Sequence, residues 1–267
     1  MAKTKPRSPA KGGSPAAAEL TEKAFLEAYD PAAFERPSVA VDVALLSVVD
    51  GSLFTLVHQR SEHPFKDKWS LPGGFVRPAE PLDAAARRLL AAKGKLTSVF
   101  LEQLYTFGDP HRDPRMRVIT VAYYALVDRR RFEQVAEGKS ELAFARIDVP
   151  WEGETGGPVQ VQQAQPGRET AAPLHLAFDH ADILGMAVKR IRGKLDYSPI
   201  GFQLLDDTFT LLDLQRVHET VLGRPLNKDS FRRRMLASGQ LEATGEMERE
   251  VDHRPAELYR FVKRSAV

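Results

Sequence analysis

The sequence of 267 residues contains no cysteine, and it has no long apolar run. Without thiols the chain can form no disulfide, thiolate metal site or cysteine nucleophile. The longest apolar run, Val43 to Val49, is interrupted by Ser47 and is far shorter than the roughly 18 residues of a membrane span. The amino-terminal residues also lack the apolar stretch of a signal peptide. We therefore expect a soluble, cytoplasmic protein with no membrane partner.

A dominant charge of one sign is also absent, because 38 Lys and Arg stand against 36 Asp and Glu, for a formal net charge of +2. This balance argues against histone-like binding of polyanions, but it does not describe how the charges are distributed over the surface. The hydrophobic fraction of 43% and the charged fraction of 28% are typical of a globular chain. The length predicts about two domains.

The first 36 residues carry little that a folded core would bury. They are rich in Lys, Pro, Ser, Gly and Ala up to about residue 18, and the charges there are all basic. Such a segment does not gain enough from burial to offset its ordering entropy. We predict a mostly disordered basic tail at 1–36, with a short helix from Leu20 to Ala28 that Thr21 caps.

Residues 37–195 alternate between strand and helix patterns. β-Branched residues in Val39 to Val49 and Leu53 to His58 predict two strands, joined by a hairpin turn at Asp50-Gly51. Further strands and helices are predicted at 83–93, 100–107, 118–127 and 178–194. Residues 154–172 are rich in Gly, Gln, Pro and Thr and have no period, so we interpret them as a mobile surface insertion.

The last part of the chain, 196–267, has a different pattern. Residues 209–222 and 227–239 predict two helices joined by a short turn, and 241–245 and 257–262 predict a two-stranded hairpin. Two helices followed by such a hairpin are typical of a winged helix-turn-helix domain that binds DNA. The change of pattern predicts a second domain.

The second helix of this pair presents arginine to solvent. At 100° per residue, Phe231, Met235 and Leu236 mark its core side, whereas Ser230, Arg233 and Ala237 lie roughly opposite. Arginine reads guanine edges and phosphates in the major groove, and short side chains let the backbone approach. The alternative interpretation is a solvated basic face. The DNA-binding residues that we predict are Asn227, Lys228, Ser230, Arg233, Arg234 and, on the wing, Arg254.

Residues 71–96, LPGGFVRPAEPLDAAARRLLAAKGKL, resemble the Nudix box of hydrolases that cleave nucleoside diphosphates linked to another group. In that pattern a Glu stands six residues after a Gly, which fits Gly74 and Glu80, and an Arg stands eight residues after the Glu, which fits Arg88. Gly94 is one place early, so a register with Arg87 at the arginine position is equally open. The resemblance extends over about 37–195 and implies an α+β fold with a Nudix-like α/β/α sandwich.

The box departs from the family where metal would bind. In either register the paired glutamates of the pattern are replaced by Ala91, Ala92 or Lys93, and Mg²⁺ requires oxygen ligands. We therefore predict no metal site, no catalytic residues and no enzymatic activity. The seven histidines show no spacing for structural zinc. The alternative is an active Nudix hydrolase of ADP-ribose or a related nucleoside diphosphate derivative.

A pocket for a nucleoside diphosphate still needs cations and a stacking face, because arginine binds phosphate with two donors and aromatic rings stack on bases. The ligand-binding residues that we predict are Arg60, Arg77, Phe107, Arg112, Arg115, Arg117 and Tyr123. The segments GDPHRDPR, RVITVAYYALV and LAFDHADIL resemble the Nudix group that handles ADP-ribose. We interpret Asp179-His180 in the last segment as a helix start capped by Asp179, in preference to a catalytic pair.

The carboxyl-terminal segment TLLDLQRVHETVLGRPLNKDSFRRRM, together with the degenerate box, resembles the Nudix-related transcriptional regulators of NAD metabolism, the NrtR type. The resemblance implies a homodimeric repressor of NAD biosynthesis or salvage genes. It also implies a palindromic operator as double-stranded DNA partner, ADP-ribose as effector and no required cofactor. A second alternative is a DNA-binding module whose Nudix-like domain serves only as a dimerisation scaffold.

Overall fold

The computed structural model describes residues 21–94, 96–135, 141–150, 159–164, 171–249, 252 and 254–262. The chain forms two units, of which one ends at Arg36 and the other comprises residues 37–267. The first unit contains helix α1 (Glu22–Ala28) and the short 3-10 helix η1 (Pro31–Ala33). The Thr21 hydroxyl caps α1 by accepting a hydrogen bond from the Ala24 amide, which confirms the predicted short helix. The rest of the predicted tail, 1–20, lies outside the described residues.

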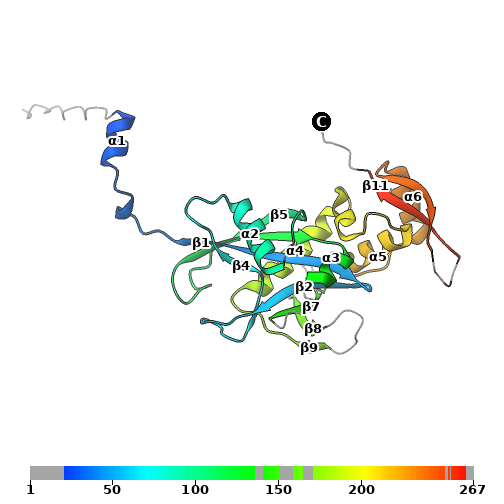
Figure 1. Ribbon diagram of the computed structural model, residues 1–267, viewed down its shortest axis with the longest axis horizontal. Coiled ribbons are helices and arrows are strands. Elements are labelled where there is room, and N and C mark those ends of the chain that lie inside the picture. Colours follow the sequence, from blue (N-terminus) through cyan, green and yellow to red (C-terminus); the bar gives the residue numbers. More distant parts are fainter. Residues whose placement is uncertain are drawn as a thin grey trace, which may run out of the picture. The chain divides into compact units, whose positions relative to one another are not determined.

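The centre of the second unit is a mixed β-sheet (Figure 1). Its strands are β1 (Ser38–Val49), β2 (Ser52–Gln59), β3 (Trp69–Ser70), β4 (Gly73–Phe75), β5 (Phe100–Phe107), β6 (Val118–Leu126), β7 (Leu142–Asp148), β8 (Gln160–Ala164) and β9 (Ala171–Pro173). The main path runs in the order β5-β6-β1-β2-β7-β8-β9, with β3 beside β2 and β4 beside β1. β1 and β6 pair in parallel, with Val41 opposite Val121. The predicted hairpin is present, with Leu46 of β1 opposite Thr55 of β2.

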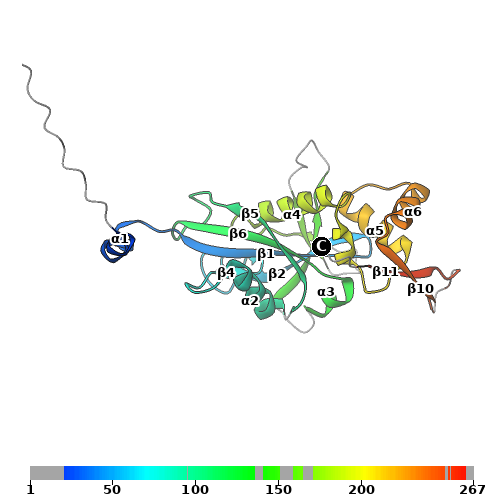
Figure 2. The same ribbon diagram turned by 90° about the horizontal axis from the view of Figure 1, so that it is seen from above.

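Helices cover both faces of this sheet (Figure 2). Helices α2 (Leu82–Gly94) and α3 (Arg129–Val135) close one core with the buried side chains Val43, Leu45 and Phe132. Helix α4 (His180–Lys194) covers the opposite face over a second core, which contains Ala44 and Leu46 of the same strand. Alternate residues of β1 therefore enter different cores, and the strand is apolar on both faces. The predicted α/β/α sandwich is confirmed.

The segment interpreted as a mobile insertion contributes to the sheet. β8 pairs antiparallel with β7, and β9 pairs with β8. Val161 and Ala164 are buried. The interpretation was wrong for these strands, because the open edge of β7 pairs with any extended backbone and does not require an apolar period. Residues 154–158 and 165–170 lie outside the described residues.

The carboxyl-terminal part begins after α4 with the 3-10 helix η2 (Pro199–Leu204). It continues with helices α5 (Leu211–Leu222) and α6 (Lys228–Ala237) and the hairpin of β10 (Leu241–Met247) and β11 (Glu257–Phe261). Phe209 pairs with Tyr259 and joins the hairpin to the helices. A small core unites these elements and contains Phe202, Leu214 and Phe231. The predicted winged helix-turn-helix is confirmed.

The two parts of the second unit share buried side chains. Leu195 after α4, Leu204 of η2 and Val221 of α5 belong to the same core as the α4 face of the sheet. The boundary that the sequence predicts near residue 195 therefore does not separate two independent cores. Within the described part of the chain, no helix is both long enough and apolar enough to cross a membrane.

Candidate functional site

One pocket opens on the sandwich where β1, β2, β4, α2, the loop 108–117 and the start of α4 meet. Glycine lets two of these elements approach each other closely. A Cβ on Gly73 of β4 would lie 2.0 Å from Oδ1 of Asp42 on β1, so no larger residue fits there. The pocket is lined by Ala40, Asp42, His58, Arg60, Gly73, Gly74, Phe75, Lys93, Arg112, Asp113, Arg115, Val118, Phe178 and His180.

A buried polar cluster forms the floor of this pocket. Nε and Nη2 of Arg112 donate to the two carboxylate oxygens of Asp179 at 2.8 and 2.6 Å, and Nη2 lies 3.4 Å from Oδ2 of Asp42. Nε2 of His180 lies 3.5 Å from Oδ1 of Asp42, and its Nδ1 accepts from the Leu71 amide at 2.9 Å. Burial alone would raise the pKa of Asp42, but His180 and Arg112 overcome it and lower that pKa to about 2. The carboxylate is therefore charged at neutral pH.

This cluster changes two sequence interpretations. The Asp179 side chain makes no capping hydrogen bond at the start of α4, contrary to the prediction, because it is engaged by Arg112 from the loop 108–117. Arg112 lines the pocket, as predicted, but only 4% of its side chain is exposed, and its charge is shared between two carboxylates. Its evident task is to hold the loop against β1 and α4.

Two further arginines stand at the mouth of the pocket beside aromatic rings. The guanidinium of Arg60 lies 4.9 Å from the centre of the Phe178 ring, and its Nε donates to the Pro64 carbonyl at 2.7 Å. The guanidinium of Arg115 lies 5.5 Å from the Phe75 ring, and its Nη2 donates to Asp113 at 2.8 Å. Both arginines were predicted from the sequence. The arrangement combines cations with aromatic faces, as an anionic ligand with a planar base would need.

His58 and Lys93 line the same pocket and were absent from the predicted ligand site. Nζ of Lys93 lies 2.7 Å from Nε2 of His58. Burial, followed by the charge of Lys93, lowers the pKa of His58 to about 3, so its ring is neutral at pH 7. Burial also lowers the pKa of Lys93 to about 8. The signal in the sequence that could have identified Lys93 as a pocket residue was its position in the box, at a place where the Nudix pattern has a glutamate.

The other four predicted ligand residues do not line the pocket. Arg77 and Arg117 are exposed, and Nη1 of Arg117 donates to the Gly108 carbonyl at 2.7 Å. Phe107 is half-buried and packs at the edge of the α4-side core, 5.5 Å from the Tyr105 ring.

Tyr123 is 2% exposed in the core under α2, and its hydroxyl donates to Asp83. The prediction that Tyr123 stacks on a base was wrong, because β6 lies in the interior of the sheet with helices over both faces. Phe75 and Phe178 are the aromatic residues that line the pocket.

An ion pair fixes the register of the degenerate box. Nε and Nη2 of Arg88 donate to the two oxygens of Glu80 at 2.6 and 2.7 Å, whereas Arg87 is exposed on α2. The hydrogen bonds from Arg88 lower the pKa of Glu80 to about 2. This pairing favours the register with Arg88 at the arginine position. Ala92 and Lys93 then occupy the positions of the paired glutamates.

The helix-turn-helix leaves four of the predicted DNA-binding residues exposed. A capping box between Thr210 and Asp213 starts α5, and Gly223 in the left-handed conformation ends it. Phe231 and Met235 of α6 are buried, as predicted, whereas the prediction that Leu236 faces the core was wrong, because its side chain is exposed at the edge of this side of the helix. Lys228, Ser230 and Arg233 of that helix are exposed, and so is Arg254 on the wing.

Two other predicted DNA-binding residues make contacts within the chain. The Asn227 side chain accepts from the Ser230 amide at 2.9 Å and so caps α6. Nη1 of Arg234 donates to Asp196 at 3.2 Å, and its guanidinium lies 5.7 Å from the Phe231 ring. Arg234 therefore turns toward the flank of α6 that faces the connection after α4, and Arg233 is the arginine farthest from the core side.

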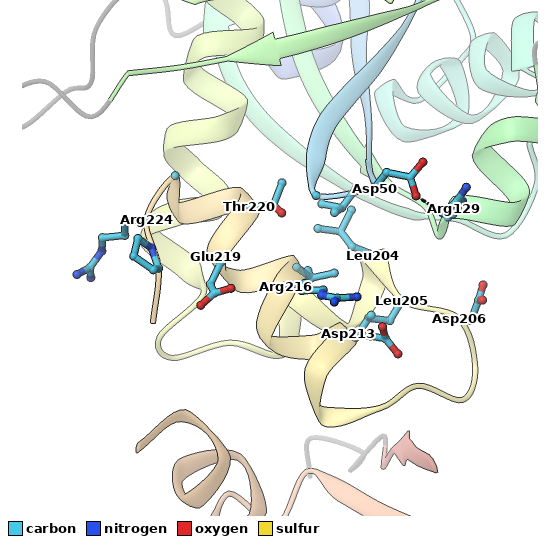
Figure 3. Close-up of a pocket in the computed structure, with 15 residues that line it drawn as sticks. Asp50, Arg129, Leu204, Leu205, Asp206, Asp213, Arg216, Glu219, Thr220 and Arg224 are labelled. Atoms are coloured by element: carbon cyan, nitrogen blue, oxygen red, sulfur yellow. Dashed lines mark hydrogen bonds and ion pairs between the residues drawn. The ribbon is translucent and has the colours of Figure 1, made fainter. Parts of the chain in front are cut away.

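The winged helix contacts the sandwich, and a cleft lies beside the contact. Arg192 of α4 is 7% exposed and donates to the carbonyls of Val221 and Val149, each at 2.7 Å. The cleft, of about 810 Å³, lies between the β1–β2 turn and α5 (Figure 3). The ion pair of Asp50 with Arg129 stands on its sandwich side, and Arg216 projects from α5.

Comparison with known proteins agrees with this architecture. Residues 36–154 match the NUDIX domain family, and residues 201–261 match the NrtR DNA-binding winged helix domain. The ADPR responsive transcriptional repressor NtrR of Acinetobacter baylyi is 36% identical over 243 residues, which are 90% of this chain and 88% of the relative. An ADP-ribose pyrophosphatase of Methanocaldococcus jannaschii is 32% identical over 87 residues, which are 33% of this chain and 49% of the relative.

A solved structure resembles both parts of the chain together. The crystal structure of Shewanella oneidensis NrtR complexed with a 27mer DNA is 32% identical, has a TM-score of 0.68, and covers 84% of this chain and 93% of its own. The likeness to the repressor extends over 90% of the chain, whereas the likeness to the hydrolase extends over 33%. The chain therefore belongs to the NrtR family, in which a Nudix domain is joined to a winged helix domain.

Proposed function

We propose that this protein is a transcriptional repressor that binds operator DNA through its winged helix and ADP-ribose in its Nudix-like pocket. The observation that carries the proposal is the presence of both sites in one compact unit, in a chain that is similar over 90% of its length to an ADPR responsive repressor. The sensor part is residues 37–195 and the DNA-binding part is residues 196–267. Genes of NAD biosynthesis or salvage are the proposed targets.

The chemistry of the pocket supports an ADP-ribose ligand. Arg60, Lys93 and Arg115 bring positive charge to the place where a diphosphate would lie. Phe75 and Phe178 offer faces for the adenine ring, and Phe75 is 41% exposed. Arginine forks and aromatic faces together match a ligand that is both doubly anionic and planar.

We propose further that the pocket does not hydrolyse its ligand. A Nudix hydrolase uses Mg²⁺ to polarise the diphosphate and activate water, and Mg²⁺ requires oxygen ligands. Ala92 has no donor atom, and Lys93 carries a positive charge that would repel a cation. The described residues contain no group of three or more His, Cys, Asp or Glu side chains that is placed to hold a metal. The residues present therefore do not fit Mg²⁺.

The exposed face of α6 supports binding in the major groove. Arg233 points away from the core of the winged helix, with Ser230 beside it, and Lys228 starts the helix. Arginine reads guanine with two donors, and lysine binds phosphate. We propose that the protein acts as a homodimer on a palindromic operator, because two recognition helices related by a two-fold axis read two half-sites.

Helix α4 gives a physical connection between the two sites. Its first turn contains His180 of the pocket floor, and Arg192 near its other end holds α5. The cleft beside this contact leaves space for α5 to tilt about it (Figure 3). We propose that ADP-ribose favours an arrangement of the two helix-turn-helix motifs that no longer matches adjacent grooves. The ligand shifts this equilibrium only by its difference in affinity for the two arrangements.

The test combines DNA binding with turnover. An operator is first selected from random double-stranded DNA with the purified protein, and its affinity is then measured by fluorescence anisotropy with and without ADP-ribose. Weaker binding at saturating ADP-ribose is expected, whereas unchanged binding would refute the effector role. Chromatography of ADP-ribose incubated with the protein and Mg²⁺ or Mn²⁺ should show no AMP, and its appearance would favour the hydrolase. If no nucleotide shifts the melting temperature, the Nudix-like part is only a scaffold.

A further inference from the structure

Lys93 lies where the register of the box places a metal-binding glutamate. The pairing of Glu80 with Arg88 sets that register, and the next turn of α2 carries Lys93 into the pocket. Its Nζ lies 2.7 Å from Nε2 of His58 on β2 and lines the same cavity as Arg60. A cation thus occupies the wall of the pocket where a hydrolase would hold cations by carboxylates.

Four cationic side chains, those of Arg60, Lys93, Arg112 and Arg115, line the pocket. The carboxylates of Asp42 and Asp113 also line it, and the carboxylate of Asp179 pairs with Arg112. Arg112 and Arg115 are held by those carboxylates at hydrogen-bond distance. His58 adds no charge, because burial and Lys93 lower its pKa to about 3. Its neutral ring serves as an acceptor that positions the ammonium group.

The position of Lys93 suits contact with an anion. Burial lowers the pKa of Lys93 to about 8, and of the neighbouring charges Asp42 raises it and Arg60 lowers it. The ammonium group is therefore mostly charged at pH 7, and it lines the pocket together with Arg60. A charge-assisted hydrogen bond from such a group to a phosphate oxygen is stronger than a neutral one.

We propose that Lys93 supplies the positive charge that a divalent metal would otherwise bring to a bound nucleoside diphosphate, and that the protein therefore binds this ligand class without metal. The inference rests on the proposed function of the pocket. It assigns to Lys93 a direct contact with the diphosphate, through an N–H donor that His58 orients. It also explains why the box has lost its carboxylates at a site that keeps its arginines.

The test is isothermal titration of the full chain with ADP-ribose, once with EDTA and once with Mg²⁺. Wild-type protein should bind with the same Kd in both buffers. Lys93→Gln should bind about 10- to 100-fold more weakly, which corresponds to one charge-assisted hydrogen bond. Lys93→Arg should restore most of the affinity, because it keeps the charge. Arg87→Gln removes one positive charge from the exposed face of the same helix and should bind as the wild type does.

Three results would overturn the inference. If Lys93→Gln binds ADP-ribose as tightly as the wild type, Lys93 does not contact the diphosphate. If Mg²⁺ lowers the Kd of the wild type, the lysine does not replace the metal. Neither result contradicts the proposal that ADP-ribose is the effector. Failure of the wild type to bind ADP-ribose in either buffer would remove the proposed function and the inference with it. Thermal unfolding of each variant provides the folding control. The melting temperature of Lys93→Gln should be no lower than that of the wild type. If it is lower, Lys93→Met is measured as a second neutral variant.

Discussion

Replacement of Arg192 by methionine tests whether α4 connects the two parts of the molecule. Methionine matches the aliphatic part of arginine but has no donor, so the carbonyls of Val221 and Val149 would each lose a hydrogen bond of 2.7 Å. Hydrogen bonds to charged groups contribute about 1.5–3 kcal/mol each. Removal of the guanidinium also recovers part of its desolvation, since burial lowers the pKa of Arg192. We expect a net loss of about 2–4 kcal/mol in the free energy of unfolding, measured in urea.

The same variant should weaken the effect of the ligand on DNA binding. Anisotropy titrations of the operator with and without ADP-ribose give the coupling free energy between the two sites. We expect this coupling to fall while the affinity for ADP-ribose itself changes little, because Arg192 lies outside the pocket lining.

Arg190→Met is the matched control for this experiment. Arg190 is on the same helix, and its Nη2 donates at 2.9 Å to the Leu104 carbonyl of β5, within the sandwich. Its loss should cost stability without loss of coupling. If Arg192→Met is as stable as the wild type, or if both variants change the coupling equally, the contact of α4 with α5 is not the connection.

Three further predictions concern the pocket, the recognition helix and acid stability. Gly73→Ala should destabilise the fold by about 1–3 kcal/mol in urea and weaken ADP-ribose binding, because its Cβ would displace the carboxylate of Asp42; unaltered binding would contradict the close fit. Arg233→Ala should weaken operator binding by about 1–3 kcal/mol if it reads a base, in anisotropy titrations, and an unchanged Kd would show that another face of α6 binds DNA. Burial lowers the pKa values of His58 and His218 to about 3 and about 4, so below pH 6.5 the unfolded state binds more protons and stability falls. At pH 5 each should cost about 2 kcal/mol relative to pH 7.5, and equal urea midpoints at the two pH values would refute this.

Local patterns predicted much of the fold. The β-branched residues of β1 and β2, the Asp50-Gly51 turn and the apolar face of α5 are each patterns of residues close in sequence. The helical-angle argument for α6 succeeded for Phe231 and Met235, which are buried, and for Arg233, which is exposed, but it was wrong for Leu236, which is also exposed. Such patterns are dictated by the geometry of one helix or one hairpin.

Local patterns did not predict which side chains meet. Tyr123 looked available for stacking, but β6 lies between β1 and β5 with helices over both faces, and its ring is buried. Asp179 looked like a cap, but the loop that carries Arg112 passes over it. In each case the deciding neighbour is tens of residues away in the sequence.

The sequence by itself determined the two-part organisation, in which a Nudix-like part is followed by a winged helix whose second helix carries exposed arginines. Only the tertiary structure decided which cations form the pocket and how they are held. Lys93 meets His58 because the sheet brings β2 beside the end of α2, and Arg88 rather than Arg87 faces Glu80 because of the path of the loop before α2. The physical reason is that periodicity records which face of an element is buried, whereas charge pairing depends on the distances that packing sets between elements.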